Sequence, residues 1–132
     1  MPIVRRLPHR LGIMVPSRDR HGHPVPKAVR AEIERVVAEW FSKAFGGSTE
    51  ERVGHRDRLI GRFEVKPGKV VVETVKEVWA QCTRREFERH RLRLARLAEW
   101  VCSHGDQAVV AITVDREMRL VAAAPGGSIG PI

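Results

Sequence analysis

Apolar residues recur along two segments of the chain at the spacing of a helix with one apolar face. In residues 29–45 they stand three or four positions apart, and a pair of glycines follows as a stop signal. In the second segment Thr83 and Glu86 have the spacing of a capping box, and the helix that they open extends to about Ser103. The sequence therefore predicts two long amphipathic helices.

Short apolar runs predict the strands of a sheet. Residues 11–15 and 108–114 are runs of the buried type. Residues 59–65 and 70–81 flank a Lys-Pro-Gly-Lys turn, and this arrangement predicts a central hairpin. The polar residues 48–58 predict an irregular connection between the first helix and that hairpin.

The order of these elements is β-α-β-β-α-β, which is the split βαβ pattern of a ferredoxin-like fold. Right-handed crossovers place both helices on one face of an antiparallel sheet and leave the other face free. Residues 118–122 predict a possible extra C-terminal strand. We expect a basic tail at residues 1–8, one α+β domain at 9–123 and a flexible tail at 124–132.

Length and composition agree with a single domain that has its own core. The chain has 132 residues, of which 42% are hydrophobic and 30% charged. It contains no apolar run long enough to span a membrane and no signal-peptide pattern, and its two cysteines are too few for a disulfide framework. We therefore expect a cytoplasmic protein with free thiols and no membrane partner.

The net charge of +8 is unevenly distributed. Residues 1–30 carry seven Lys and Arg against one Asp, whereas residues 31–132 carry 17 bases and 15 acids. A local positive block attracts polyanions such as nucleic acid or an acidic protein. The alternative is that the arginine content reflects composition alone.

One face of the second predicted helix carries a row of guanidinium groups. At 100° per residue these lie on the side opposite the apolar stripe, with an indole among them. The residues of this candidate nucleic-acid-binding face are Arg85, Arg89, Arg93, Arg96 and Trp100. Such a row is suited to hold phosphates while the indole stacks on a base. The alternative is a solvated face with Trp100 covered by the tail or a partner chain.

Arg91 and His90 are the second candidate site, a pocket for a small ligand. Arg91 projects into the apolar arc, where a charge must be paired or lie at an edge, and His90 borders the same arc. We expect an ion pair of Arg91 with Glu73 or Glu77, or an anionic ligand. The alternative is that Arg91 extends past the edge of the helix into solvent.

Cys82 completes this candidate pocket. It directly precedes the helix N-terminus, and the helix dipole together with Arg84 and Arg85 lowers the pKa of a thiol in that position. The sequence places no histidine or acid to complete a nucleophilic site. An inert buried cysteine is the alternative.

Two weaker motifs suggest metal chemistry. Asp57 with Glu64 and Lys66 is similar to the acid-acid-lysine arrangement of Mg²⁺-dependent nucleases, although all three lie on one short stretch that ends in a turn. Asp19, His21 and His23 share one loop but lack an evident fourth ligand. We therefore predict no metal, no cofactor and no catalytic residues.

These patterns favour a non-enzymatic binding module that engages nucleic acid or another polyanion and forms a homodimer. Two alternatives remain open. One is an enzyme or small-ligand-binding protein with a site between the sheet and the helices. The other is a structural subunit that dimerises through the free face of the sheet.

Overall fold

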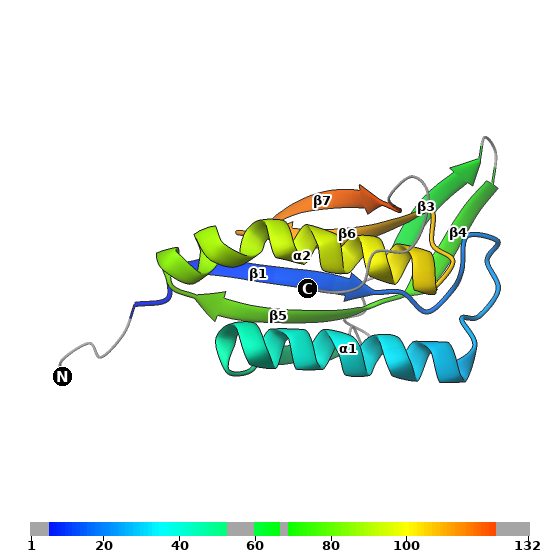
Figure 1. The fold of residues 1–132 in the computed structure, drawn as a ribbon. Helices are drawn as coiled ribbons and strands as arrows, with labels where there is room; N and C mark the ends of the chain where they lie inside the picture. The colour runs from blue at the N-terminus through cyan, green and yellow to red at the C-terminus, as the bar shows by residue number, and fades with distance from the viewer. Residues whose placement is uncertain (1–5, 53–59, 67–68, 124–132) are drawn as a thin grey trace.

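The computed structural model describes residues 6–52, 60–66 and 69–123, and side chains over 6–50 and 75–123. Five strands form one sheet in the order β2-β5-β1-β6-β7, in which all neighbouring strands are antiparallel. These strands are β1 (His9–Val15), β2 (Thr49–Arg52), β5 (Lys76–Cys82), β6 (Val109–Val114) and β7 (Glu117–Ala122). The strand β1 lies at the centre of the sheet (Figure 1).

Two helices cover one face of this sheet (Figure 1). The helix α1 (Lys27–Phe45) ends at Gly46, whose left-handed backbone, with φ of 79°, allows its N–H to cap the carbonyl of Ser42. The helix α2 (Arg84–His104) begins with the predicted capping box. Their apolar stripes and alternate residues of β1, β5 and β6 form one core in which Phe41, Leu94 and Val101 are fully buried.

The predicted fold class is confirmed. The elements β1, α1, β2, β5, α2 and β6 follow the ferredoxin-like order, and β7 is the extra C-terminal strand. Both long helices lie where the apolar spacing places them. The apolar spacing and the capping signals that predicted the two helices are local in sequence, and the buried faces of the helices match that spacing.

The predicted hairpin forms, but its expected place at the centre of the main sheet is wrong. The strands β3 (Ile60–Lys66) and β4 (Lys69–Thr74) pair with each other in a separate two-stranded sheet at the end of the main sheet where β1 ends (Figure 1). The continuous strand expected over 70–81 is divided at Val75 into β4 and β5. In the main sheet, β5 pairs on one side with β2, which lies in the stretch expected to be irregular. The backbone of Thr49–Arg52 forms this pairing despite its polar sequence.

Alternation along the strands gives the sheet two distinct faces. On β1, Leu11, Ile13 and Val15 face the helices, so Arg10 and Gly12 belong to the opposite face, which neither helix covers. We call this opposite side the outer face. A small second cluster of Met14, Val75 and Ala111 lies apart from the main core. Within the described ranges, neither helix is apolar enough over its length to cross a membrane.

Candidate functional site

A buried carboxylate lies on the outer face, where three adjacent strands meet. The residue is Glu77 of β5, and only 5% of its surface is exposed. Its Oε1 accepts a hydrogen bond from Arg10 Nη2 at 2.9 Å, and its Oε2 accepts one from Thr113 Oγ1 at 3.0 Å. Because both oxygens have a donor, the cost of burying this charge is offset.

The indole of Trp79, two residues after Glu77 on β5, lies beside Arg10. The guanidinium carbon of Arg10 lies 3.8 Å from the centroid of the Trp79 ring, within the range of a cation–π contact. The Nε1 atom of Trp79 is buried, and among the residues that the structure describes it has no hydrogen-bond partner. A buried donor without an acceptor is costly in a native protein, so Trp79 has an unused hydrogen bond at this point of the surface.

Gly12 of β1 allows these side chains to close over the central strand. A Cβ at this position would meet Thr113 Oγ1 well inside contact distance, and would lie 3.0 Å from Trp79 Cβ and 3.1 Å from Glu77 Oε2. We call Arg10, Gly12, Glu77, Trp79 and Thr113 the outer-face cluster. It combines an anion, a cation, a hydroxyl and an aromatic ring within a few ångströms.

Asp115 joins the start of β1 to the turn between β6 and β7. Its Oδ1 accepts a hydrogen bond from the backbone N–H of Arg10 at 2.9 Å, and its Oδ2 lies 2.9 Å from His9 Nδ1. Desolvation by burial raises the pKa of Asp115, but the hydrogen bonds from Arg10 and His9 outweigh it and leave the pKa below its ordinary value. This carboxylate therefore holds the strand that carries Arg10.

The arginines predicted on α2 do share an exposed side, but the indole is not with them. Arg85, Arg89, Arg93 and Arg96 are all exposed. Trp100 is only 9% exposed, belongs to the main core, and stacks on His104 with ring centroids 4.8 Å apart. No exposed aromatic ring therefore accompanies these guanidinium groups among the described residues of α2.

Arg91 lies at the edge of the helix and does not pair with Glu77, one of its two expected partners. Its side chain is 43% exposed, and its Nε lies 3.4 Å from Glu88 Oε2 on the same helix. Glu77 is held by Arg10 on the other face of the sheet, and the side chain of Glu73 lies outside the described residues. The edge position considered as the alternative for Arg91 is the one observed.

Cys82 is buried in the core, and the expected lowering of its thiol pKa is wrong. Burial raises the pKa to about 11, and the negative charges of Glu86 and Asp115 act in the same direction. Desolvation is the largest cause of this shift, and Arg84 and Arg85, which were expected to lower the pKa, are exposed to solvent. The structure does not bring Cys82, His90 and Arg91 together in one pocket.

His90 instead lines a groove between the two helices. This α1–α2 groove has a volume of about 280 Å³. Its lining residues are Val36, Glu39, Trp40, Lys43, Ala44, His90 and Arg93. Of the three residues of the predicted pocket, His90 is the one that lines this groove.

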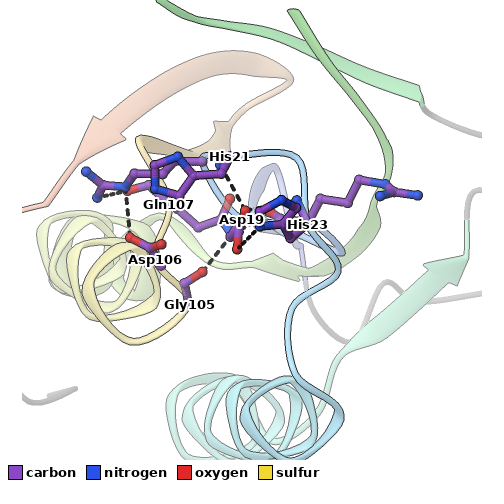
Figure 2. A network of polar contacts seen from close by, with 8 residues as sticks. Asp19, His21, His23, Gly105, Asp106 and Gln107 are labelled. Atoms are coloured by element: carbon purple, nitrogen blue, oxygen red, sulfur yellow. Dashed lines mark hydrogen bonds and ion pairs between the residues drawn. The ribbon is translucent and has the colours of Figure 1, made fainter.

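The loop between β1 and α1 is fixed by the carboxylate of Asp19. Figure 2 shows His21 and His23 on either side of it, and Asp19 Oδ1 accepts their backbone N–H groups at 2.8 and 3.0 Å. Among the described residues, no group of three His, Cys, Asp or Glu side chains is arranged to hold a metal. Asp19 therefore organises a polar turn here.

The same loop is anchored to the turn after α2 (Figure 2). The buried Gln107 donates through Nε2 to the carbonyls of Arg18 at 2.6 Å and Gly105 at 2.9 Å. Arg20 forms an ion pair of 2.8 Å with Asp106. This part of the basic N-terminal block thus makes internal contacts that position the loop.

The nuclease-like motif gains no geometric support. Asp57 lies outside the described residues, and Glu64 and Lys66 lie on β3, whose side chains are likewise outside the described ranges.

Sequence reasoning missed the outer-face cluster. Arg10 was counted as part of a basic block, and Glu77 was considered only as a partner of Arg91. One signal was present, since Gly12 interrupts an apolar strand, and a glycine inside a strand often marks a close approach of other groups. The partners themselves come from strands that are distant in sequence.

The fold and this face define an α+β sandwich of two helices on an antiparallel sheet with a polar cluster on the uncovered side. Two solved structures are similar in fold. One is a phage SAM lyase in complex with S-methyl-5'-thioadenosine, with a TM-score of 0.59 and 13% identity over 92% of this chain and 97% of that one. The other is a phage SAM lyase in the apo state, with a TM-score of 0.53 and 12% identity over the same shares.

No protein-family model and no curated protein sequence matches the chain. The structural neighbours overturn the principal functional hypothesis, because they are enzymes, one with a small molecule bound, and not nucleic-acid-binding modules. The expectation of a non-enzymatic protein is corrected with it. The alternative of an enzyme or small-ligand-binding protein is the better supported one.

Proposed function

We propose that this chain is a lyase for S-adenosylmethionine or a closely related sulfonium, that it releases S-methyl-5'-thioadenosine, and that the outer-face cluster binds the substrate. The likeness to the phage SAM lyases supports this, because it extends over 92% of this chain and 97% of theirs. The likeness thus extends over nearly the whole of both chains.

The observation that carries the proposal is the buried pair of Glu77 and Arg10 beside Trp79. The methionine part of the substrate carries an ammonium and a carboxylate. A fixed carboxylate and a fixed guanidinium, 2.9 Å apart, complement these two groups. Glu77 accepts from the ammonium, and Arg10 donates to the substrate carboxylate.

Trp79 supplies the third kind of contact. The face of an indole attracts a cation and stacks on a planar ring, so it suits either the sulfonium or the adenine of this substrate. Its buried Nε1 lacks an acceptor, and an oxygen or ring nitrogen of the ligand would satisfy it. The cluster therefore offers a contact for each part of the molecule.

The chemistry places modest demands on the protein. Cleavage of the bond between the sulfonium sulfur and the γ carbon of the aminobutyrate group leaves a neutral thioether that needs no proton. In the step that we propose, an oxygen of the substrate's own carboxylate forms a bond to this carbon as the carbon–sulfur bond breaks, and the aminobutyrate part leaves as a lactone, so that atoms and charge balance without a co-reactant. A reaction that loses charge is favoured where the charged ground state is poorly solvated. The protein's task is thus to bind, to orient the amino acid part and to exclude water, which the outer-face cluster does with Arg10, Glu77 and Trp79.

The first prediction concerns Glu77. The purified full chain is incubated with S-adenosylmethionine, and S-methyl-5'-thioadenosine is quantified by mass spectrometry. We expect Glu77→Gln to lower kcat/KM by about 10- to 100-fold, because a neutral amide loses the charge-assisted hydrogen bond to the ammonium. Glu88→Gln, the same change on the exposed face of α2, is the matched control and should leave the rate unchanged.

Two outcomes would contradict different parts of this proposal. Wild-type protein that forms no more product than a blank overturns the lyase function. Full activity in a folded Glu77→Gln variant overturns the assigned site but leaves the function standing. Because a change at the buried Glu77 can also destabilise the fold, Arg10→Lys serves as a second variant. We expect Arg10→Lys to raise KM for S-adenosylmethionine. Inhibition by S-methyl-5'-thioadenosine should stay the same, because this molecule lacks the amino acid group.

A second copy of this chain is the partner that we propose for the outer face, as the sequence suggested. In support, Met118 and Leu120 of β7 are 54% and 59% exposed. Light scattering on the purified chain tests this, and a monomeric mass at assay concentration would contradict it. An acidic protein or nucleic acid has no role in the proposal.

A further inference from the structure

The α1–α2 groove lies outside the outer-face cluster and has no role in the proposed lyase reaction. It is bounded by residues of both helices that are far from Arg10 and Glu77 in the fold, because the helices cover the opposite face of the sheet. Its volume of about 280 Å³ is slightly below the range of about 300–1,000 Å³ that drug-sized ligands occupy. A compact molecule fits such a space.

Part of the lining of the groove is apolar and aromatic. Val36, Trp40 and Ala44 of α1 line it, and Trp40 is only 7% exposed. The His90 ring meets Trp40 and Phe45 edge-on, with centroid distances of 6.0 and 5.3 Å. These contacts hold a wall of rings against which the apolar body of a ligand can pack.

The charged groups of the groove are unequally satisfied. Glu39 is engaged with Arg35, whose Nη1 lies 3.1 Å from Glu39 Oε1. Lys43 and Arg93, in contrast, form no ion pair with any carboxylate among the described side chains, and they approach the groove from different helices. Two cations therefore face a space with an apolar lining.

We propose that the α1–α2 groove binds a small organic monoanion, a compact apolar or aromatic body that carries one carboxylate. The body packs against Trp40 and His90, and the carboxylate lies between Lys43 and Arg93. An inorganic anion lacks the apolar body, and a neutral ring lacks the charge, so both bind more weakly. This site is independent of the lyase function.

His90 contributes a neutral hydrogen-bonding group to this site. Desolvation by burial, together with the positive charges of Arg93 and Arg89, lowers the pKa of His90 against the smaller opposing effect of Glu86. At neutral pH its ring therefore offers one N–H and one lone pair, and the positive charge of the groove comes from Lys43 and Arg93.

Binding is tested by NMR titration of the full chain with benzoate, in the absence of S-adenosylmethionine. We expect saturable shifts of the Trp40 indole N–H and of the His90 ring protons. Arg93→Met and Lys43→Met should each weaken benzoate at least tenfold, because each removes a charge-assisted hydrogen bond and keeps most of the side-chain volume. Arg96→Met, on the same helix but outside the lining, is the matched control and should bind benzoate as wild type does.

Two further probes define the ligand class. We expect benzamide, the neutral counterpart of benzoate, and acetate, which has no ring, to bind at least tenfold more weakly. The proposal is overturned if benzoate shifts neither Trp40 nor His90, if benzamide binds equally well, or if Arg93→Met and Arg96→Met behave alike. Because the readout is binding alone, each of these results is separate from the presence or absence of lyase activity.

Discussion

Two buried residues of β5 show that burial has different consequences for a carboxylate that is paired and for a thiol that is near negative charges. Glu77 and Cys82 are both buried but belong to opposite faces of the sheet. The carboxylate of Glu77 has a donor on each oxygen, so its position is fixed and its charge is compensated. The thiol of Cys82 is desolvated and near negative charges, and its pKa rises to about 11. Glu77 is thus a paired charge on the outer face, whereas Cys82 is an unreactive thiol of the core.

Gly12 gives the sharpest test of the outer-face cluster at the scale of one residue. We expect Gly12→Ala to lower the free energy of unfolding by about 1–3 kcal/mol, because the new methyl group overlaps Thr113 Oγ1 and crowds Glu77 and Trp79. Chemical denaturation followed by circular dichroism measures the change. Lyase activity, if present, should fall with it, since the same side chains move.

Thr113→Ala provides the control through a double-mutant cycle. It removes the hydroxyl that the new methyl group would meet most closely, so Gly12→Ala should cost less in that background than in the wild type. Strictly additive effects would contradict the steric explanation. Coupling between the two positions would support the close approach of β6 to β1.

Single residues were predictable where their surroundings are local and not where the partner is remote. Arg10 and Glu77 are 67 positions apart, and only the pairing of β1 with β5 brings them together. The helical position of Trp100 was predictable, but its indole turned out to stack on His104 in the core, because an angle on a helix does not determine how a large side chain packs.

At the scale of the element, predictability follows the range of the interactions. The helix α2 has its start signal within four residues, since Thr83 Oγ1 accepts from Glu86 N and Glu86 Oε1 accepts from Thr83 N. The strand β2 has the polar sequence Thr-Glu-Glu-Arg and no pattern of its own. It is a strand because β5 supplies hydrogen-bond partners to its backbone, and no local window contains that information.

The capping box yields a prediction for α2. We expect Thr83→Ala to lower the free energy of unfolding by about 1 kcal/mol, because the backbone N–H of Glu86 loses its acceptor. Thermal or chemical unfolding of the purified chain measures this change. Ser42→Ala is the control, since Ser42 is an exposed hydroxyl residue in the last turn of α1 and does not cap a helix N-terminus. Equal stability of the two variants would contradict the role of Thr83.

At the scale of the whole molecule, fewer of the basic side chains behind the net charge of +8 are available to a partner than the sequence suggested, because some are paired within the fold. Arg10 is bound to Glu77, and Arg20 to Asp106. Part of the basic N-terminal segment is therefore used to hold β1 and the loop after it in place. The exposed arginines of α2 remain, and Arg93 among them faces the α1–α2 groove.

Two carboxylates, one bonded to the start of β1 and one in the loop that follows the strand, have pKa values below their ordinary value. Asp115 binds the start of the strand at His9 and Arg10. Asp19 organises the loop that follows the strand. Desolvation by burial raises the pKa of Asp19, but the backbone hydrogen bonds from His23 and His21, with the charges of these histidines, outweigh it and lower the pKa. The start of β1 and the loop after the strand are thus expected to be sensitive to acid.

A group whose pKa is lower in the folded state stabilises the fold above its unfolded pKa, and that contribution is lost as the pH falls through the folded value. Since both carboxylates lie below the ordinary value of 3.8, the loss is expected below pH 3.8. The double variant Asp19→Asn/Asp115→Asn should therefore melt at a lower temperature than wild type at pH 6, and the difference should shrink between pH 3.8 and about 2.5. Melting curves across this range measure it, with the exposed Glu117→Gln as a control that follows wild type throughout. A difference that is the same at pH 6 and pH 2.5 would show that the two carboxylates do not anchor β1 through their charge.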